Sequence, residues 1–182
     1  MKIKLKNVRL AFPSLFEAKT VNGEGEPRFS AVFLLDPKHP QLEEIRAALK
    51  QVAKEKWAGK WESIYNQMEK QLKLCLHDGD EKGDYEGFPG NFFLNAANKA
   101  RPAVLDRDRT TLIQADGRPY AGCFVHAVVD IWAQDNNFGK RINASLGGVQ
   151  FFRDGDAFAG GGVANPDDFD DISEGADADA LI

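Results

Sequence analysis

A single stretch of helical periodicity, residues 42–72, interrupts a chain whose other apolar segments are short, and this arrangement most limits the possible fold. Apolar residues recur at helical spacing on both sides of a break at Ala58-Gly59: Leu42, Ile45, Leu49 and Val52, then Trp61, Ile64, Tyr65, Met68 and Leu72. We expect this stripe to be core, as in most amphipathic helices of globular domains. A doubly wound α/β enzyme would need a helix between most of its strands, so the chain is predicted to be mainly β.

Strand-like segments lie on both sides of the helical region. Residues 2–10 alternate lysine with apolar side chains, and residues 28–36 are almost entirely apolar, which indicates a central strand. A turn-rich connection, residues 19–27, is expected between them. Further apolar runs follow the helical region, at residues 91–96, 102–106, 110–113, 123–133 and 140–146, and Asn136, Asn137 and Gly139 predict a hairpin between the last two.

The pattern predicts a small, partly open barrel over residues 1–155, with a helical insertion at about residues 38–74. The five-stranded OB-fold is one such barrel, and other small barrels share the pattern. Residues 156–164 contain three consecutive glycines and read as a flexible linker. Residues 165–182 have too few apolar groups to offset the entropy of ordering, so we expect a disordered acidic tail.

The acidic tail reverses the sign of the charge. The chain has 28 acidic and 23 basic side chains, a net charge of −5, and seven of the acids lie in residues 165–182, which contain no Lys or Arg. Residues 1–164 therefore have 21 acids against 23 bases. Because a binding surface responds to local charge, the acidic average does not exclude a nucleic-acid ligand.

The sequence lacks the common enzyme and cofactor signatures. It has no phosphate-binding G-x-x-x-x-G-K-[ST] loop, no G-x-S-x-G elbow and no zinc-deaminase motif. Residues 78–84 begin like a calcium loop, but Lys82 and Pro89 stand at two ligand positions. Two cysteines and no long apolar run favour a soluble protein of a reducing cytosol. We predict no catalytic residue, no metal and no cofactor.

One enzymatic alternative remains open. Asp106 and Asp108 could serve a metal-dependent nuclease or recombination enzyme. Arg107 and Arg109 alternate with these acids and favour a solvated or phosphate-facing strand end instead. A module that interacts with proteins or mimics DNA through its acids is a third reading.

Basic and aromatic side chains gather in residues 83–112. Single-stranded nucleic acid is bound without sequence preference by cations that follow the phosphates and by rings that stack on the bases. The glycines and the proline around Phe88 predict that its ring stands out of the surface, and only one of Phe92 and Phe93 is expected to be exposed. The candidate binding residues of this stretch are Tyr85, Phe88, Phe92, Lys99, Arg101, Arg107 and Arg109.

Two other segments add candidates. Alternation in residues 123–133 directs Val125, Val129 and Ile131 inward and Trp132 to the mixed face, where it would stack on a base or be covered by the helical region. The following hairpin supplies Lys140 and Arg141. Lys4 and Lys6, on the polar face of the first strand, either contact phosphates or form a solvated face.

The segments GDYEGFPGNFFLNAANKARPAVLDRDR and GKRINASLGGVQFFRDGDAFAGG, with the opening KIKLKNVRLAFPSLFEAK, resemble a family of bacteriophage single-stranded-DNA-binding proteins. The resemblance implies an OB-fold core, binding of single-stranded DNA without strong sequence preference, and a role in phage replication or recombination in the cytoplasm of the infected bacterium. It also implies a functional acidic C-terminus.

The tail is expected to compete with DNA for the cationic groove and to recruit phage or host replication proteins. A tethered tail acts at high effective concentration, so it would yield to long single strands but exclude weak ligands. The expected ligands are single-stranded DNA and, more weakly, duplex DNA, with no membrane. The tail residues assigned to these roles are Asp167, Asp168, Phe169, Asp170, Asp171, Ile172, Leu181 and Ile182.

Overall fold

The computed structural model describes residues 1–21, 23–158, 170 and 172. Five main strands form its framework: β1 (Lys2–Val21), β2 (Glu24–Leu35), β4 (Phe92–Asn98), β6 (Phe124–Asn136) and β7 (Gly139–Arg153). Two shorter strands, β3 (Leu76–Asp78) and β5 (Ala103–Leu105), pair with β4 and β7.

The five main strands close into a barrel. Their order is β4-β2-β1-β6-β7 with antiparallel neighbours, and a parallel contact of Ala97 in β4 with Ser145 in β7 closes the ring. This connectivity is that of an OB-fold, in which the third and fifth strands meet in parallel. The predicted OB-fold-like barrel with one helical insertion is confirmed, and the predicted tail lies outside the described residues except for Asp170 and Ile172.

The barrel core consists of the inward faces of these strands. Phe33, Leu94 and Leu146 are fully buried in it. On β6 the predicted alternation holds, because Val125, Val129 and Ile131 are buried while Trp132 is exposed.

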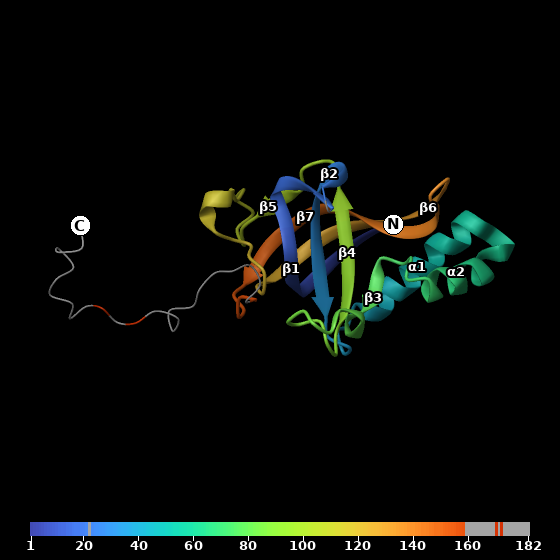
Figure 1. Cartoon of the computed structure of the whole chain (residues 1–182), viewed down its shortest axis with the longest axis horizontal. Helices are drawn as coiled ribbons and strands as arrows, with labels where there is room; N and C mark the ends of the chain where they lie inside the picture. Colours follow the sequence, from blue (N-terminus) through green and yellow to red (C-terminus); the bar gives the residue numbers. More distant parts are fainter. Residues whose placement is uncertain (22, 159–169, 171, 173–182) are drawn as a thin grey trace.

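The helical insertion consists of α1 (Leu42–Trp57) and α2 (Trp61–Lys70), joined by one 3-10 turn (Ala58–Lys60). In Figure 1 both helices lie beside β3 at one end of the barrel. Ala58 has φ +46°, which marks the break predicted at this point. The Trp57 indole donates a hydrogen bond to the Asp135 carboxylate at 3.0 Å, so it fastens the insertion to the end of β6. Neither helix of the described residues is long and apolar enough to cross a bilayer.

The hairpin of β1 and β2 is longer than the sequence predicts. Both strands continue through most of residues 19–27, and the register shifts three times between Ala11 and Val21. Bulges absorb the irregular, exposed residues that we interpreted as a loop. Gly23, with φ +74°, occupies the tight turn.

β1 changes partner along its length. Residues 2–9 pair with β6, and the register with β2 begins at Arg9. Before that point the Gln41 side chain bonds to the other edge of β1: its Oε1 accepts from Lys6 N at 2.7 Å, and its Nε2 donates to the Lys4 carbonyl at 2.7 Å. A ring nitrogen of His39 lies 2.9 Å from the Lys6 carbonyl. These contacts fix the backbone of the two lysines.

A second apolar cluster lies under residues 79–91. Phe88 is only 2% exposed and packs with Ala11, Leu34 and Phe93. The predicted protruding Phe88 ring is therefore wrong. The loop passes close to its own start, since a Cβ on Gly79 would lie 1.9 Å from the Phe88 carbonyl oxygen, and the Phe88 ring packs inward against the second cluster.

Residues 154–158 remain attached to the barrel after β7 ends. The Arg9 guanidinium donates to the Asp156 carbonyl at 2.7 Å and lies 4.2 Å from the centre of the Phe158 ring. Phe158 N donates to the Ala121 carbonyl at 3.1 Å. The first residues of the stretch predicted as a linker therefore lie against the barrel, next to the start of β6.

Candidate nucleic-acid interface

The first groove lies over β2 and β4 and is bordered by the β6–β7 hairpin. It has a volume of about 880 Å³, and Arg28, Lys99 and Arg141 contribute cations to its lining. None of the described residues that line it is Asp or Glu. This face of an OB-fold, together with the loop between its fourth and fifth strands, is the usual site of oligonucleotide binding. A polyanion entering the groove would meet these cations and no carboxylate of the described lining residues.

Two exposed rings border the first groove. Trp132 on β6 is 42% exposed, and its Nε1 donates to Ser145 Oγ at 2.9 Å. Phe138, at the tip of the hairpin, is 86% exposed. An apolar ring of this size without cover is unusual on a surface and is available for stacking. Trp132 was among the predicted binding residues, whereas Phe138 was missed, although its place in a predicted hairpin tip was a usable signal.

The second groove, about 580 Å³, lies between β1 and β5 on the outer face of β6 and β7. Lys4 and Lys6 line it together with Lys2. The two grooves share Asn98 and Ser145 in their linings. The structure thus brings Lys4, Lys6, Trp132 and Arg141 to one connected surface.

The remaining basic candidates are dispersed. Lys99 lines the first groove but forms an ion pair with Glu26, which lowers the pKa of that carboxyl. Arg101 donates to the Phe16 carbonyl at 2.7 Å and lies outside both grooves. Arg107 lies 5.9 Å from the Phe152 ring. Lys140 faces α2 with its Nζ 3.7 Å from Asp135, so it points away from the groove that Arg141 lines.

Tyr85 and Phe92 also lie apart from the first groove. Tyr85 is half-exposed and packs edge-on against Phe12, 5.0 Å between ring centres. Phe92 is half-buried, and Phe93 beside it is buried, as expected for neighbours on a strand. Phe92 lines a different groove beside the helices, where Arg46 and Lys50 stand against Glu62, Glu69, Asp78 and Glu81. That excess of carboxylates would repel phosphates.

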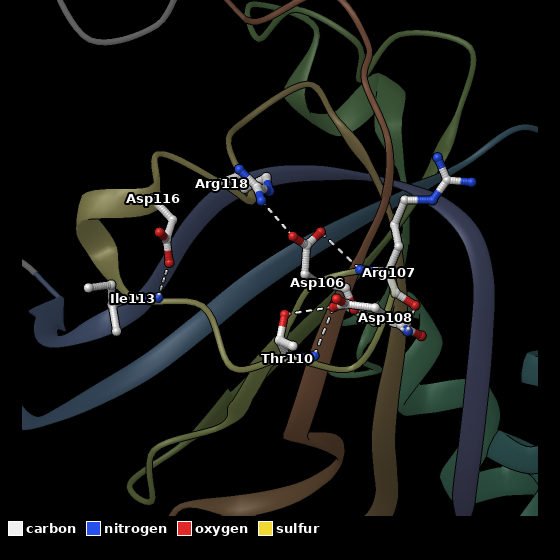
Figure 2. Close-up of polar contacts among 8 residues, drawn as sticks. Asp106, Arg107, Asp108, Thr110, Ile113, Asp116 and Arg118 are labelled. Carbon is white, nitrogen blue, oxygen red and sulfur yellow. Dashed lines mark hydrogen bonds and ion pairs between the residues drawn. The ribbon is translucent and has the colours of Figure 1, made fainter.

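Asp106 and Asp108, the acids of the nuclease alternative, accept hydrogen bonds from residues of the same loop region, as Figure 2 shows. The Asp106 carboxylate accepts a hydrogen bond from Arg118 at 2.5 Å and from Arg107 N at 2.9 Å. Asp108 accepts from the hydroxyl and the backbone of Thr110. These bonds lower the pKa of both carboxyls. No group of three His, Cys, Asp or Glu side chains among the described residues could hold a metal ion.

Arg109 stands in the same turn with φ +70° and is exposed. It lines neither the first nor the second groove. Sequence reasoning missed Arg28 and His77, which line the first groove, and His126, which lines the second. Burial and then the nearby Lys6 lower the pKa of His126, whose ring stacks on Phe152 at 4.5 Å.

The fold and the carboxylate-free groove define an OB-fold barrel with a surface suited to polyanions. Comparison with known proteins specifies the family. The family model described as "Enterobacter phage Enc34, ssDNA-binding protein" matches residues 1–181. The chain belongs to this family, which confirms the resemblance found in the sequence.

Individual relatives agree with this assignment. A protein of Acyrthosiphon pisum secondary endosymbiont phage 1, protein p50, is 52% identical over 184 residues, covering 100% of this chain and 99% of its own. The structure of the single-stranded DNA-binding protein from bacteriophage Enc34 in complex with ssDNA has a TM-score of 0.73 at 27% identity, and the match covers 87% of this chain and 89% of that one. The bacteriophage T7 single-stranded DNA binding protein gp2.5 shares the fold, with a TM-score of 0.56 at 13% identity over 90% of this chain and 98% of that one.

Proposed function

We propose that this protein binds single-stranded DNA without strong sequence preference and organises it during phage replication or recombination, in the cytoplasm of the infected bacterium. It acts as a binder and not as an enzyme. The observation that carries the proposal is the first groove: three cations, no lining carboxylate, and the exposed rings of Trp132 and Phe138 at its border.

The groove explains the absence of sequence preference. Ring faces stack on any base, at about 1–3 kcal/mol per base, and Arg28 and Arg141 supply charge that attracts phosphates of any sequence. Duplex DNA keeps its bases stacked inside the helix, so it offers only its phosphates to this surface and binds more weakly.

A fluorescence titration tests this function. Of the three tryptophans, Trp57 bonds to Asp135 and Trp61 lies under Lys54, which leaves Trp132 as the reporter at the groove. We expect oligo-dT to quench the emission, with an affinity that falls as salt rises, and we expect most of the quenching to disappear in Trp132→Phe. Emission that does not respond to oligo-dT at low salt, together with no binding by anisotropy, would contradict the function.

We further propose that the acidic tail competes with DNA for this surface and recruits replication proteins. Two facts support it: seven carboxylates in residues 165–182, and the anchoring of residues 154–158 beside the start of β6. Because residues 154–158 are attached to the barrel, the segment that leads to the tail starts at the barrel surface. A short connection of this kind keeps the effective concentration of the tail near the groove high.

Truncation after Ala164 tests the competition. The truncated protein should bind single-stranded DNA more tightly than the full chain, most clearly at low salt, because screening weakens the attraction of the tail to the groove. Replacing the seven acids by their amides in the full chain separates charge from length and should give the same tightening. Equal affinities for the full-length and truncated proteins would exclude competition.

A further inference from the structure

The second groove is a depression on the outside of the barrel, and it is separate from the usual OB-fold binding face. One wall is β1 with Lys4 and Lys6, and the other is β5 with Ala103 and Leu105. Val128 and the Gly147-Gly148 pair also line it, between these walls. The depression is therefore charged along one side and mostly apolar elsewhere.

Two glycines, Gly147 and Gly148, lie in the floor of the second groove. Gly147 lies at the shift of register between β6 and β7, where Val128 pairs with Gly148 and Val129 with Leu146. A Cβ on Gly147 would come to 3.2 Å from the Val128 carbonyl, and one on Gly148 to 3.2 Å from the Ala103 carbonyl. Glycine thus allows close approach of the three strands and leaves the floor without a side chain at these two positions. An apolar floor with such a gap suits the face of a nucleobase.

The lysines on the wall are held in place and remain available. Gln41 and His39 fix the backbone of Lys4 and Lys6, and both side chains are exposed. Among the ion pairs of the described residues none involves either lysine. The one carboxylate that lines the groove, Asp130, is bound to the amino terminus at 2.7 Å.

The two grooves adjoin each other. Asn98 and Ser145 line both, at the point where β4 meets β7 and closes the barrel. The Asn98 amide donates to the Leu146 carbonyl at 3.0 Å, which stabilises this closure. Trp132, bonded to Ser145, stands at the border, so a strand stacked on its indole has its next nucleotides directed to either groove.

We propose that a single strand bound in the first groove continues across Ser145 and Asn98 into the second groove, where Lys4 and Lys6 bind two of its phosphates and the glycine floor receives a base. The inference rests on the proposed function, because it extends the same track. It makes the second groove a nucleotide subsite that only longer strands reach.

Oligo-dT of increasing length, over about 4–16 nucleotides, tests the subsite with the full-length protein. The variant is Lys4→Ala/Lys6→Ala, and the matched control is Lys60→Ala/Lys70→Ala, which removes the same charge from exposed positions of the helical insertion. For short strands that fill only the first groove, all three proteins should bind alike. For long strands the test variant alone should lose affinity, and its log K against log salt plot should be less steep by about 1.4, at about 0.7 per phosphate contact.

The other outcomes overturn the inference in distinct ways. Equal binding by wild type and test variant at every length would remove the second groove from the path of the DNA. Equal losses at all lengths, or the same loss in the control, would mean that the lysines act only through net charge. Failure of the proposed function would appear differently, as wild-type protein that binds neither short nor long strands, and it would remove both proposals.

Discussion

The Trp132 indole donates a hydrogen bond to Ser145 Oγ at 2.9 Å, across the β6–β7 pair and at the point where the two grooves meet. This bond orients a ring that is 42% exposed. A fixed ring loses little freedom when a base stacks on it, so the pair is a pre-organised element of the candidate interface.

Trp132→Ala should weaken binding of single-stranded DNA about 5- to 150-fold, the equivalent of about 1–3 kcal/mol for one stacked base. Ser145→Ala should have a smaller effect, because the ring remains but its orientation is no longer fixed. Fluorescence anisotropy with labelled oligo-dT measures both. Phe92→Leu is the control, since Phe92 lines the acidic groove beside the helices; an equal loss in this variant would show that the ring of Trp132 has no special role.

Adjacent cations on β7 should differ in their contribution to the salt dependence. Arg141 lines the first groove, whereas Lys140 faces α2 and Asp135. Arg141→Ala should therefore reduce the salt slope of binding by about 0.7, the value for one phosphate contact on a single strand. Lys140→Ala changes net charge equally and should leave the slope close to that of the wild type. Titrations at four or more salt concentrations give both slopes, and identical slopes for the two variants would count against the assigned groove.

Phe88 should matter for stability and not for DNA binding. Its ring is buried against Phe93, 5.1 Å between ring centres, and against Leu34 and Ala11. Phe88→Ala should lower the free energy of unfolding by about 3–5 kcal/mol, the usual effect of removing a buried aromatic side chain. Urea denaturation measures this loss. Tyr85→Ala removes a half-exposed ring and should lower the free energy of unfolding less. If folded Phe88→Ala protein lost DNA affinity at a temperature well below its unfolding, the ring would have a binding role after all.

The loss of folding stability at acid pH should depend on Asp106. Hydrogen bonds from Arg118 and from the backbone of Arg107 lower the pKa of its carboxyl in the folded state. The unfolded chain then binds more protons than the folded one as pH falls, so the stabilisation is present above the ordinary carboxyl pKa and is lost as pH falls through the folded value. Asp106→Asn should be less stable at neutral pH and less sensitive to acid. Urea midpoints between pH 7 and pH 3 give the comparison, and parallel profiles would contradict the assignment.

Short-range patterns in the sequence predicted the parts of this fold that depend on period. The helical period of residues 42–72 predicted the insertion, and the alternation of residues 123–133 predicted the inward face of β6. Both patterns are visible in the sequence because an element that buries one face repeats apolar residues at its own period. The family resemblance added the OB-fold connectivity. The length of the first hairpin could not be predicted, since bulges allow glycine and charged residues to continue in paired strands.

The candidate interface was only partly visible in the sequence. Trp132, Arg141 and the β1 lysines were named, yet their assembly depends on barrel closure, which joins Ala97 to Ser145 across 48 positions of the chain. Phe88 was misjudged because glycine and proline neighbours are typical of exposed loops, while tertiary contacts decide the direction of the ring. Arg101 and Lys140 are basic like Arg141, but Lys140 is the neighbour of Arg141 on β7 and faces the other way, and Arg101 is turned to the Phe16 carbonyl.

The Gln41 contacts to β1 also bear on self-association. An unpaired strand edge is a template on which another chain can add, and folded proteins protect such edges. Here one amide and one imidazole occupy the backbone groups of Lys4 and Lys6 that a foreign strand would need. An incoming β-segment would first have to break three hydrogen bonds, so this edge of β1 is protected against β-augmentation. The side chains of Lys4 and Lys6 stay open to solvent at the same time.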